Sequence, residues 1–115
     1  MAEGCIFCDI ANGDKAAEMV YQNERVVAFR DIAPQAPVHI LVIPRKHIGS
    51  LAGIDNSDIE LLGTMILAAS DIAEEMGLDR TGFRVVFNTG SDGGQIVDHL
   101  HLHLLGGKNL GKLVS

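Results

Sequence analysis

Three histidines alternate near the end of the chain, at positions 99, 101 and 103, and a leucine follows each. A β-strand points successive side chains to opposite faces, so this spacing predicts that His99, His101 and His103 share one face and the leucines share the other. Imidazole can act as a nucleophile, a general acid or base, or a metal ligand. If His101 attacks an electrophilic phosphorus, one neighbour can hold its ring in the right tautomer while the other protonates the departing group.

A glycine-rich turn, residues 89–94, precedes these histidines directly. Bare backbone can approach phosphate oxygens closely and offer N–H donors to them. The turn lacks the Gly-Lys-Ser/Thr ending of a nucleotide-hydrolase P-loop, so alone it is more typical of a flexible hairpin turn. Beside the histidines it indicates phosphorus chemistry.

Two cysteines, Cys5 and Cys8, are separated by two residues near the start of the chain. Such a pair can be a redox couple, half of a zinc site, or two small apolar residues in a helix. Zinc requires two further ligands, for which His47 and His99 are the candidates. A competing hypothesis is a catalytic zinc on the three alternating histidines, with an open position for water.

The elements that must position these groups follow from periodicity and turn residues. Apolar residues recur at helical spacing over 55–76, with a capping box expected from Ser57 to Glu60 and a stop at Gly77. A short helix is expected over 5–11, and strands over 19–22, 25–30, 39–44, 83–87 and 97–105. This order indicates an α+β fold, a five-stranded antiparallel sheet with one long helix and a short N-terminal helix. Because the long helix covers one face, the other is expected to serve a ligand or a second subunit.

Length and charge limit the class of protein. The 115 residues predict a single domain, 1–115, with residues 1–4 and 108–115 loosely ordered. A net charge of −6 argues against nucleic acid as a partner, and no apolar run is long enough to span a membrane. The acidic start lacks the features of a secretory signal, so we expect a cytoplasmic protein.

Several stretches, in order along the chain, resemble the histidine triad (HIT) family, and most closely its nucleotide-binding (Hint) branch. They are residues 5–10 (Cys-Ile-Phe-Cys-Asp-Ile), 29–39, 41–48 and, most specifically, 90–107. The resemblance implies a HIT-like homodimer in which two five-stranded sheets join into one, with a purine nucleotide of the AMP or GMP type bound on the sheet. It also implies hydrolysis of purine nucleoside 5′-phosphoramidates through a nucleotidyl-histidine intermediate.

Roles carry over from the family position by position. His101 would be the nucleophile, His103 would contact the phosphate and leaving group, and His39 would support the triad. Asp31 would accept hydrogen bonds from the ribose hydroxyls. Asn88 would lie near the phosphate, with Gly94 and Val97 as backbone donors to it. The apolar wall around the base would comprise Ile6, Phe7, Ile10, Phe29, Ile32 and Leu41.

The resemblance also bears on the metal. In several relatives the four positions of Cys5, Cys8, His47 and His99 hold a structural zinc, and no cofactor is needed for catalysis. His99 would then be a structural ligand, whereas otherwise it would orient the triad.

Two departures from the family pattern keep other functions open. Many members of the branch carry a serine or threonine hydroxyl where this chain has Ile96, and the tail 108–115 is of a short bacterial type. The alternatives are a nucleotide-binding or adaptor protein with incidental hydrolysis, and a dinucleoside polyphosphate hydrolase.

Overall fold

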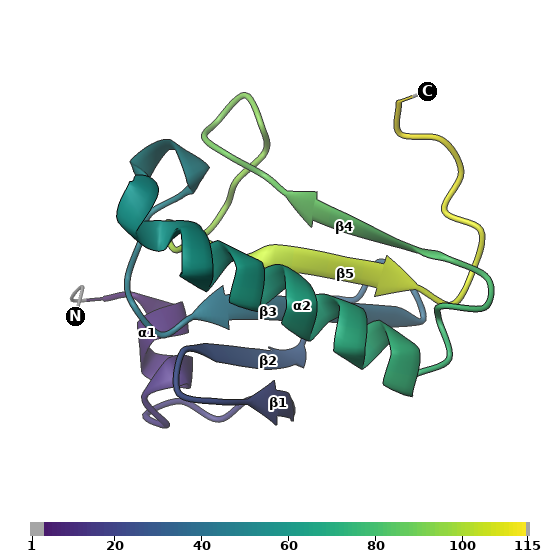
Figure 1. Ribbon diagram of the computed structural model, residues 1–115, viewed down its shortest axis with the longest axis horizontal. Helices are drawn as coiled ribbons and strands as arrows, with labels where there is room; N and C mark the ends of the chain where they lie inside the picture. Colours follow the sequence, from purple (N-terminus) through teal and green to yellow (C-terminus); the bar gives the residue numbers. More distant parts are fainter. Residues whose placement is uncertain (1–3, 115) are drawn as a thin grey trace.

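A computed structural model describes residues 4–114 and contains one antiparallel sheet, one long helix and one short helix (Figure 1). The expected α+β architecture is therefore confirmed. The elements are α1 (Ile6–Ala11), β1 (Met19–Gln22), β2 (Val26–Arg30), β3 (Val38–Pro44), α2 (Ile59–Glu75), β4 (Phe83–Phe87) and β5 (Leu102–Gly106), with short 3-10 turns at Leu51–Gly53 and Asn56–Asp58.

The five strands lie in the order β1-β2-β3-β5-β4, and every neighbouring pair is antiparallel. The register places Phe29 opposite Leu41, and Leu41 opposite His103. Because side chains directly opposite one another share a face, these three residues form one row across the centre of the sheet. The outer edges of β1 and β4 are left without a neighbouring strand within the described chain.

β2 and β3 are buried on both faces, which explains their nearly continuous apolar sequences, whereas β5 alternates buried and half-buried residues. Alternation sends one set of side chains, including Ala28, Val42 and Leu102, toward α2. The other set, including Phe29 and Leu41, packs with Phe7 of α1 in a second cluster. α1 covers only part of this second face, so the remainder is open for a ligand, as expected.

Helix α2 lies across one face of the sheet, and its buried stripe (Leu61, Met65, Ala68, Ala69, Ile72 and Ala73) recurs at helical spacing (Figure 1). Gly77 ends it with φ at 75°, as expected. The expected capping box from Ser57 to Glu60 is wrong. Asp55 caps the preceding 3-10 turn instead, and Asp58 completes the box by accepting from the Asp55 backbone N–H at 3.0 Å.

The strand that carries the histidines is shorter than expected. β5 begins at Leu102, so His103 belongs to the ladder, while His99 lies in a bend and His101 in irregular backbone before the strand. Leu100, Leu102 and Leu104 are nonetheless all buried in the cluster under α2. Burial of every second residue in this cluster thus continues beyond the hydrogen-bonded ladder.

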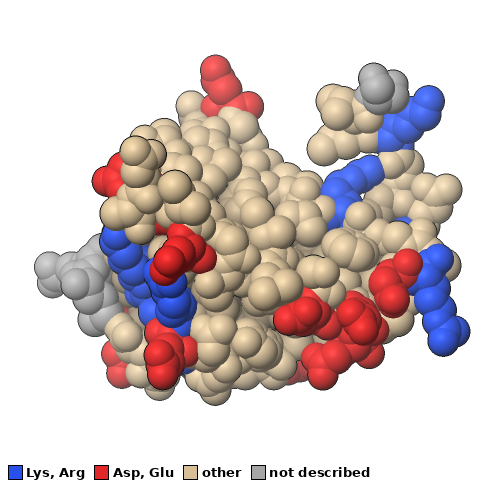
Figure 2. Space-filling view, in the orientation of Figure 1, with Lys and Arg blue, Asp and Glu red and all other residues tan. Residues whose placement is uncertain are grey.

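The ends and the surface add little to the site. Residues 1–3 and 115, part of the ends expected to be loosely ordered, lie outside the described residues, and residues 108–114 form neither helix nor strand. Figure 2 shows small, separate groups of acidic and basic side chains around an uncharged area on the face that carries α2. None of the described helices combines the length and hydropathy needed to cross a membrane.

Candidate active site

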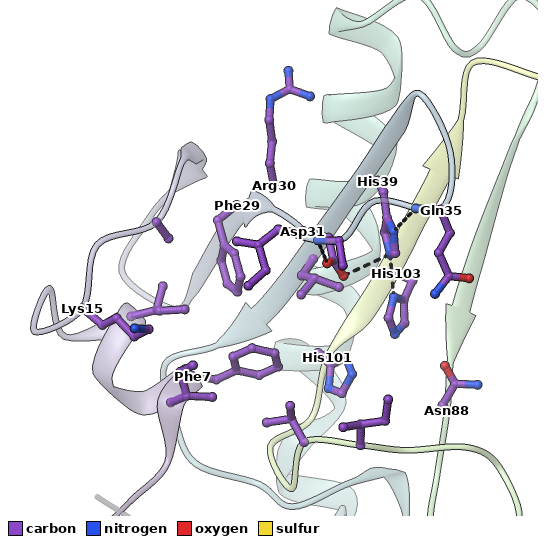
Figure 3. A pocket seen from close by; sticks show the side chains of 18 of the residues that line it. Phe7, Lys15, Phe29, Arg30, Asp31, Gln35, His39, Asn88, His101 and His103 are labelled. Atoms are coloured by element: carbon purple, nitrogen blue, oxygen red, sulfur yellow. Dashed lines mark hydrogen bonds and ion pairs between the residues drawn. The ribbon is translucent and has the colours of Figure 1, made fainter.

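A cavity of about 400 Å³ lies on the sheet face opposite α2, walled by α1, the central strands and the loop before β5 (Figure 3). Its volume is within the range of small-molecule sites. Every residue that the sequence predicted to contact substrate lines it: Ile6, Phe7, Ile10, Phe29, Asp31, Ile32, Leu41, Asn88, Gly94 and Val97. His39, His101 and His103 line it as well, whereas His99 does not.

His101 is held by the backbone immediately before it. Its Nδ1 lies 2.7 Å from the carbonyl oxygen of His99, and a carbonyl only accepts, so Nδ1 carries the proton. The neutral ring then has its lone pair on Nε2. The ring packs edge-on against Phe7, with centroids 5.1 Å apart, and the residue is 6% exposed. His101 is thus a buried imidazole with a fixed tautomer suited to nucleophilic attack through Nε2.

His39 and His103 form a directed chain of hydrogen bonds. The backbone N–H of Gln35 donates to His39 Nδ1 at 3.1 Å, so the His39 proton is on Nε2. His39 Nε2 lies 2.9 Å from His103 Nδ1 and donates to it. The remaining proton of His103 is then on Nε2. This tautomer can donate to a leaving group or to a phosphate oxygen.

Burial keeps these two imidazoles neutral. Desolvation, together with the neighbouring His101 and His39, lowers the pKa of His103 to about 4. Desolvation also lowers the pKa of His39, and the nearby Asp31 carboxylate opposes that shift in part. At neutral pH both rings therefore hold the tautomers that their hydrogen bonds select.

Asp31 follows β2 and turns its carboxylate toward the same cavity. One oxygen accepts from the Ala33 backbone N–H at 2.8 Å, and the other lies 3.5 Å from His39 Nε2. The next residue, Ile32, is 99% exposed and lines the rim. The carboxylate is only partly buried, so its free lone pairs can accept from ligand hydroxyls.

The glycine-rich loop is folded tightly against itself. A Cβ at Gly93 would lie 2.3 Å from the Thr89 carbonyl oxygen, so only glycine fits there. Asn88 donates to the Gly93 carbonyl at 2.8 Å. The predicted backbone donors differ: Gly94 N–H donates within the loop to Ser91 at 3.1 Å, whereas Val97 N–H has no partner among residues 4–114.

A second group of side chains lies beside the cavity, at the start of α1. Cys5, Cys8, His47 and His99 bring their ligand atoms within 4.8 Å of one another. Cys5 Sγ is 3.3 Å from His99 Nδ1, Cys8 Sγ is 3.3 Å from His47 Nδ1, and the two Nδ1 atoms are 3.2 Å apart. His99 Nε2 donates to the Pro44 carbonyl at 2.8 Å, which leaves the Nδ1 lone pair for the cluster. This arrangement could hold a metal ion.

The competing catalytic zinc on the three alternating histidines is not supported by this geometry. The two candidate metal clusters within residues 4–114 do not combine His99, His101 and His103, because His99 Nδ1 faces the cysteines. The other cluster combines Asp31, His39 and His103. There the Gln35 N–H occupies His39 Nδ1, so Nε2 carries a proton and has no lone pair for a metal.

Sequence reasoning missed some cavity residues and the backbone groups that set the tautomers. Lys15 and Gln35 line the cavity, and the carbonyls of Pro44 and His99 orient two rings. A lysine in a polar turn carries no signature of a site. Backbone donors and acceptors are common to nearly all residue types, so no sequence pattern could have indicated them.

Known proteins are similar to this chain over nearly its whole length. The protein family described as "Scavenger mRNA decapping enzyme C-term binding" matches residues 4–113. The purine nucleoside phosphoramidase of Escherichia coli (strain K12) is 44% identical over 115 residues, covering 100% of this chain and 97% of that protein.

Two solved structures are also similar. A histidine triad protein from Clostridium difficile is 47% identical, with a TM-score of 0.96 and coverage of 99% of both chains. A HIT family hydrolase from Legionella pneumophila Philadelphia 1 is 46% identical, with a TM-score of 0.93 and coverage of 94% of this chain and 96% of that one.

Stability should fall on acidification because of the buried imidazoles. His103 titrates near pH 4 when folded but near its ordinary value of 6.5 when unfolded, so between these values the unfolded chain binds more protons. The stabilisation is complete above about pH 6.5 and is lost as pH falls toward about 4. Urea unfolding midpoints measured from pH 7 to pH 4 should decline, and His103→Gln should flatten that decline. Equal slopes in the two proteins would contradict this account.

Proposed function

The chain belongs to the histidine triad family, and from that premise we propose that it hydrolyses purine nucleoside 5′-phosphoramidates through a nucleotidyl-histidine intermediate. The E. coli relative named purine nucleoside phosphoramidase supports this substrate class. The observation that carries the proposal is His101, whose Nδ1 proton is bound to the His99 carbonyl and whose Nε2 lone pair is available in a cavity shared with His103 and Asp31.

In the first step, His101 Nε2 forms a bond to phosphorus as the phosphorus-nitrogen bond of the substrate breaks. The ring gains positive charge, and its Nδ1–H bond to the His99 carbonyl stabilises that charge. The departing amine takes up a proton from Nε2 of His103 in its protonated form, which the anionic substrate beside the ring favours, and the ring is left neutral. In the second step, water attacks phosphorus, the bond to His101 Nε2 breaks, and the nucleoside monophosphate leaves.

His39 acts through His103. While His103 is neutral, the His39 donor at its Nδ1 directs the Nε2–H of His103 away from His39 and toward the substrate. When protonated His103 has given its Nε2 proton to the amine, the neutral ring can accept one at Nε2 from the attacking water, so the same nitrogen serves both steps. His39 is therefore a positioning residue in the proposed reaction.

The remaining lining suits a nucleoside. The Phe7 and Phe29 rings pack edge-to-face, with centroids 5.6 Å apart, and together with Leu41 they offer an apolar wall for a base. Asp31 lies between this wall and the histidines and can accept from ribose hydroxyls (Figure 3).

One observation favours a second candidate function, a nucleotide-binding or adaptor protein whose hydrolysis is incidental. Ile96 lines the cavity and is 92% exposed, so an apolar side chain stands where many relatives have a hydroxyl. It cannot donate a hydrogen bond to a phosphate or a leaving group. Binding of a nucleotide without turnover would support this alternative.

We further propose that the cluster of Cys5, Cys8, His47 and His99 binds a structural zinc. Tetrahedral coordination at ordinary bond lengths implies edges of roughly 3.3 Å between two nitrogens and roughly 3.6 Å between nitrogen and sulfur. The separations of 3.2 Å between nitrogens and 3.3–3.5 Å between nitrogen and sulfur fit this shape. Bound zinc would cross-link the start of α1 to the segments after β3 and before β5.

We also propose a cytoplasmic homodimer. β4 is an edge strand, and apolar side chains are exposed on it and on the outer side of α2: Phe83, Val85, Ile59, Ile66 and Leu67. A second copy meeting β4 edge to edge would extend the sheet and cover this surface. Cys5 and Cys8 are not joined by a disulfide, in keeping with a reducing compartment.

The covalent intermediate provides the direct test. Protein quenched during turnover of adenosine phosphoramidate should carry one nucleotidyl group on the peptide that contains His101. His101→Ala should lose both the adduct and about 10³-fold or more of the rate. His103→Ala should lower the rate by about 10²–10⁴-fold while its nucleophile remains. Full turnover by His101→Ala, or an adduct on another residue, would contradict the mechanism.

Zinc should be bound and structural. Purified protein should contain about one zinc per chain by mass spectrometry, and Cys5→Ser should lower both the zinc content and the melting temperature because binding is coupled to folding. His101→Ala serves as the control and should keep its zinc. Hydrolysis should persist in chelator below the melting temperature. If chelation abolishes hydrolysis while the fold is intact, the metal is catalytic rather than structural.

The dimer should dissociate when the free edge of β4 carries a charge. Val85→Lys places an ammonium at this edge, and sedimentation velocity should then show a monomer where the unaltered chain is a dimer. Val114→Lys, at an exposed position near the end of the chain, adds the same charge and should leave the dimer intact. A monomeric unaltered chain would refute the proposal.

A further inference from the structure

Lys15 lies in the connection between α1 and β1 and lines the cavity. Figure 3 shows its side chain directed toward the cavity beside Phe7 and Phe29, at the end remote from His103 and Asn88. The side chain is exposed, so it stands at the rim rather than inside the apolar wall. The proposed mechanism gives this cation no role.

The backbone of this connection is fastened to α1. The N–H groups of Asp14 and Lys15 both donate to the Asp9 carbonyl oxygen, at 2.8 and 3.3 Å. The preceding Gly13 has φ at 81°, a conformation that favours glycine and reverses the chain at this point. Lys15 therefore projects from a defined backbone position even though its side chain reaches solvent.

The Lys15 ammonium forms no ion pair or hydrogen bond with the described part of the protein. Within residues 4–114, none of the salt bridges and hydrogen bonds involves its Nζ. Arg30 also lines the cavity, but its Nε is 2.6 Å from the Glu18 carboxylate, and its side chain points away from the labelled phenylalanine and histidine rings in Figure 3. Lys15 is thus the cation at this end that has no ion pair within residues 4–114.

The row of residues across the sheet shows which part of a nucleotide would meet Lys15. His103, Leu41 and Phe29 are opposite one another on β5, β3 and β2, so they span about 10 Å at the usual strand spacing. In the proposed function the phosphate lies at the histidines and the ribose at Asp31. The base then lies against Phe7 and Phe29, with its outer edge toward Lys15.

We propose that Lys15 is a specificity-determining residue that favours a 6-oxopurine, guanine or hypoxanthine, over adenine. An ammonium group donates and never accepts. Guanine presents two adjacent acceptors, O6 and N7, to such a donor, whereas adenine presents N7 beside an N6 amino group that also donates. This inference rests on the proposed function, because it assumes that a purine nucleotide occupies the cavity.

Nucleotide affinity tests the proposal directly. Calorimetric titration of the full chain with GMP, IMP and AMP should give about five- to tenfold tighter binding of GMP and IMP than of AMP, at the lower end of base discrimination by such contacts. Lys15→Met should lower the affinities for GMP and IMP to that for AMP, and should leave the affinity for AMP unchanged. Lys15→Arg should keep the preference. With guanosine phosphoramidate as substrate, Lys15→Met should raise KM and leave kcat unchanged.

Arg80→Gln provides the matched control, because it removes one positive charge from an exposed position outside the cavity. It should leave all three affinities unchanged. Equal affinity of the unaltered chain for GMP and AMP would overturn the proposal. An equal loss of affinity for all three nucleotides in Lys15→Met would also overturn it, because it would indicate a general attraction of Lys15 for the phosphate. Failure of the unaltered chain to bind any of the three would instead refute the proposed function.

Discussion

The strict alternation of side chains across β2, β3 and β5 is the constraint on which the rest of the structure depends. One set of residues faces α2 and forms the main core, and the other faces the cavity. The register places Phe29, Leu41 and His103 in one row, so that part of the apolar wall and one histidine of the candidate site lie side by side on the sheet. A slip of one residue in β5 would turn His103 toward the core and Leu102 toward the ligand. Burial of the leucines therefore holds the histidine in place.

Backbone groups then fix the orientation of the histidine rings that the alternation places on this face. The Gln35 N–H and the carbonyls of Pro44 and His99 each fix one imidazole tautomer. His99 links the two centres, since its ring nitrogen faces the cysteines while its carbonyl accepts from His101. The proposed zinc and the proposed nucleophile thus depend on the position of one residue. A structural metal at the proposed site would influence the proposed reaction without contacting the substrate.

The sequence predicted the architecture well because periodicity records burial, which is a local signal. It predicted the extent of β5 poorly, because Leu100 is buried in the same cluster as Leu102 and Leu104 although it precedes the hydrogen-bonded strand. It placed the helix cap at Ser57 rather than Asp55, because both residues are good caps and tertiary contacts decide between them: Asp58 is buried and bound to Lys46 at 2.9 Å. The division of labour among the histidines needed the structure, since tautomers are set by backbone atoms that no side-chain pattern encodes.

Burial of neutral imidazoles has a consequence for how the proposed reaction would be controlled. Desolvation and the neighbouring His101 and His39 disfavour an extra proton on His103, whose pKa is lowered to about 4. An anionic phosphoramidate entering beside this ring would favour the protonated form, since an opposite charge nearby raises a histidine pKa. The cavity would therefore become a better proton donor when a substrate is present. With Ile96 unable to donate at the rim, this response of His103 would determine how readily the amine leaves.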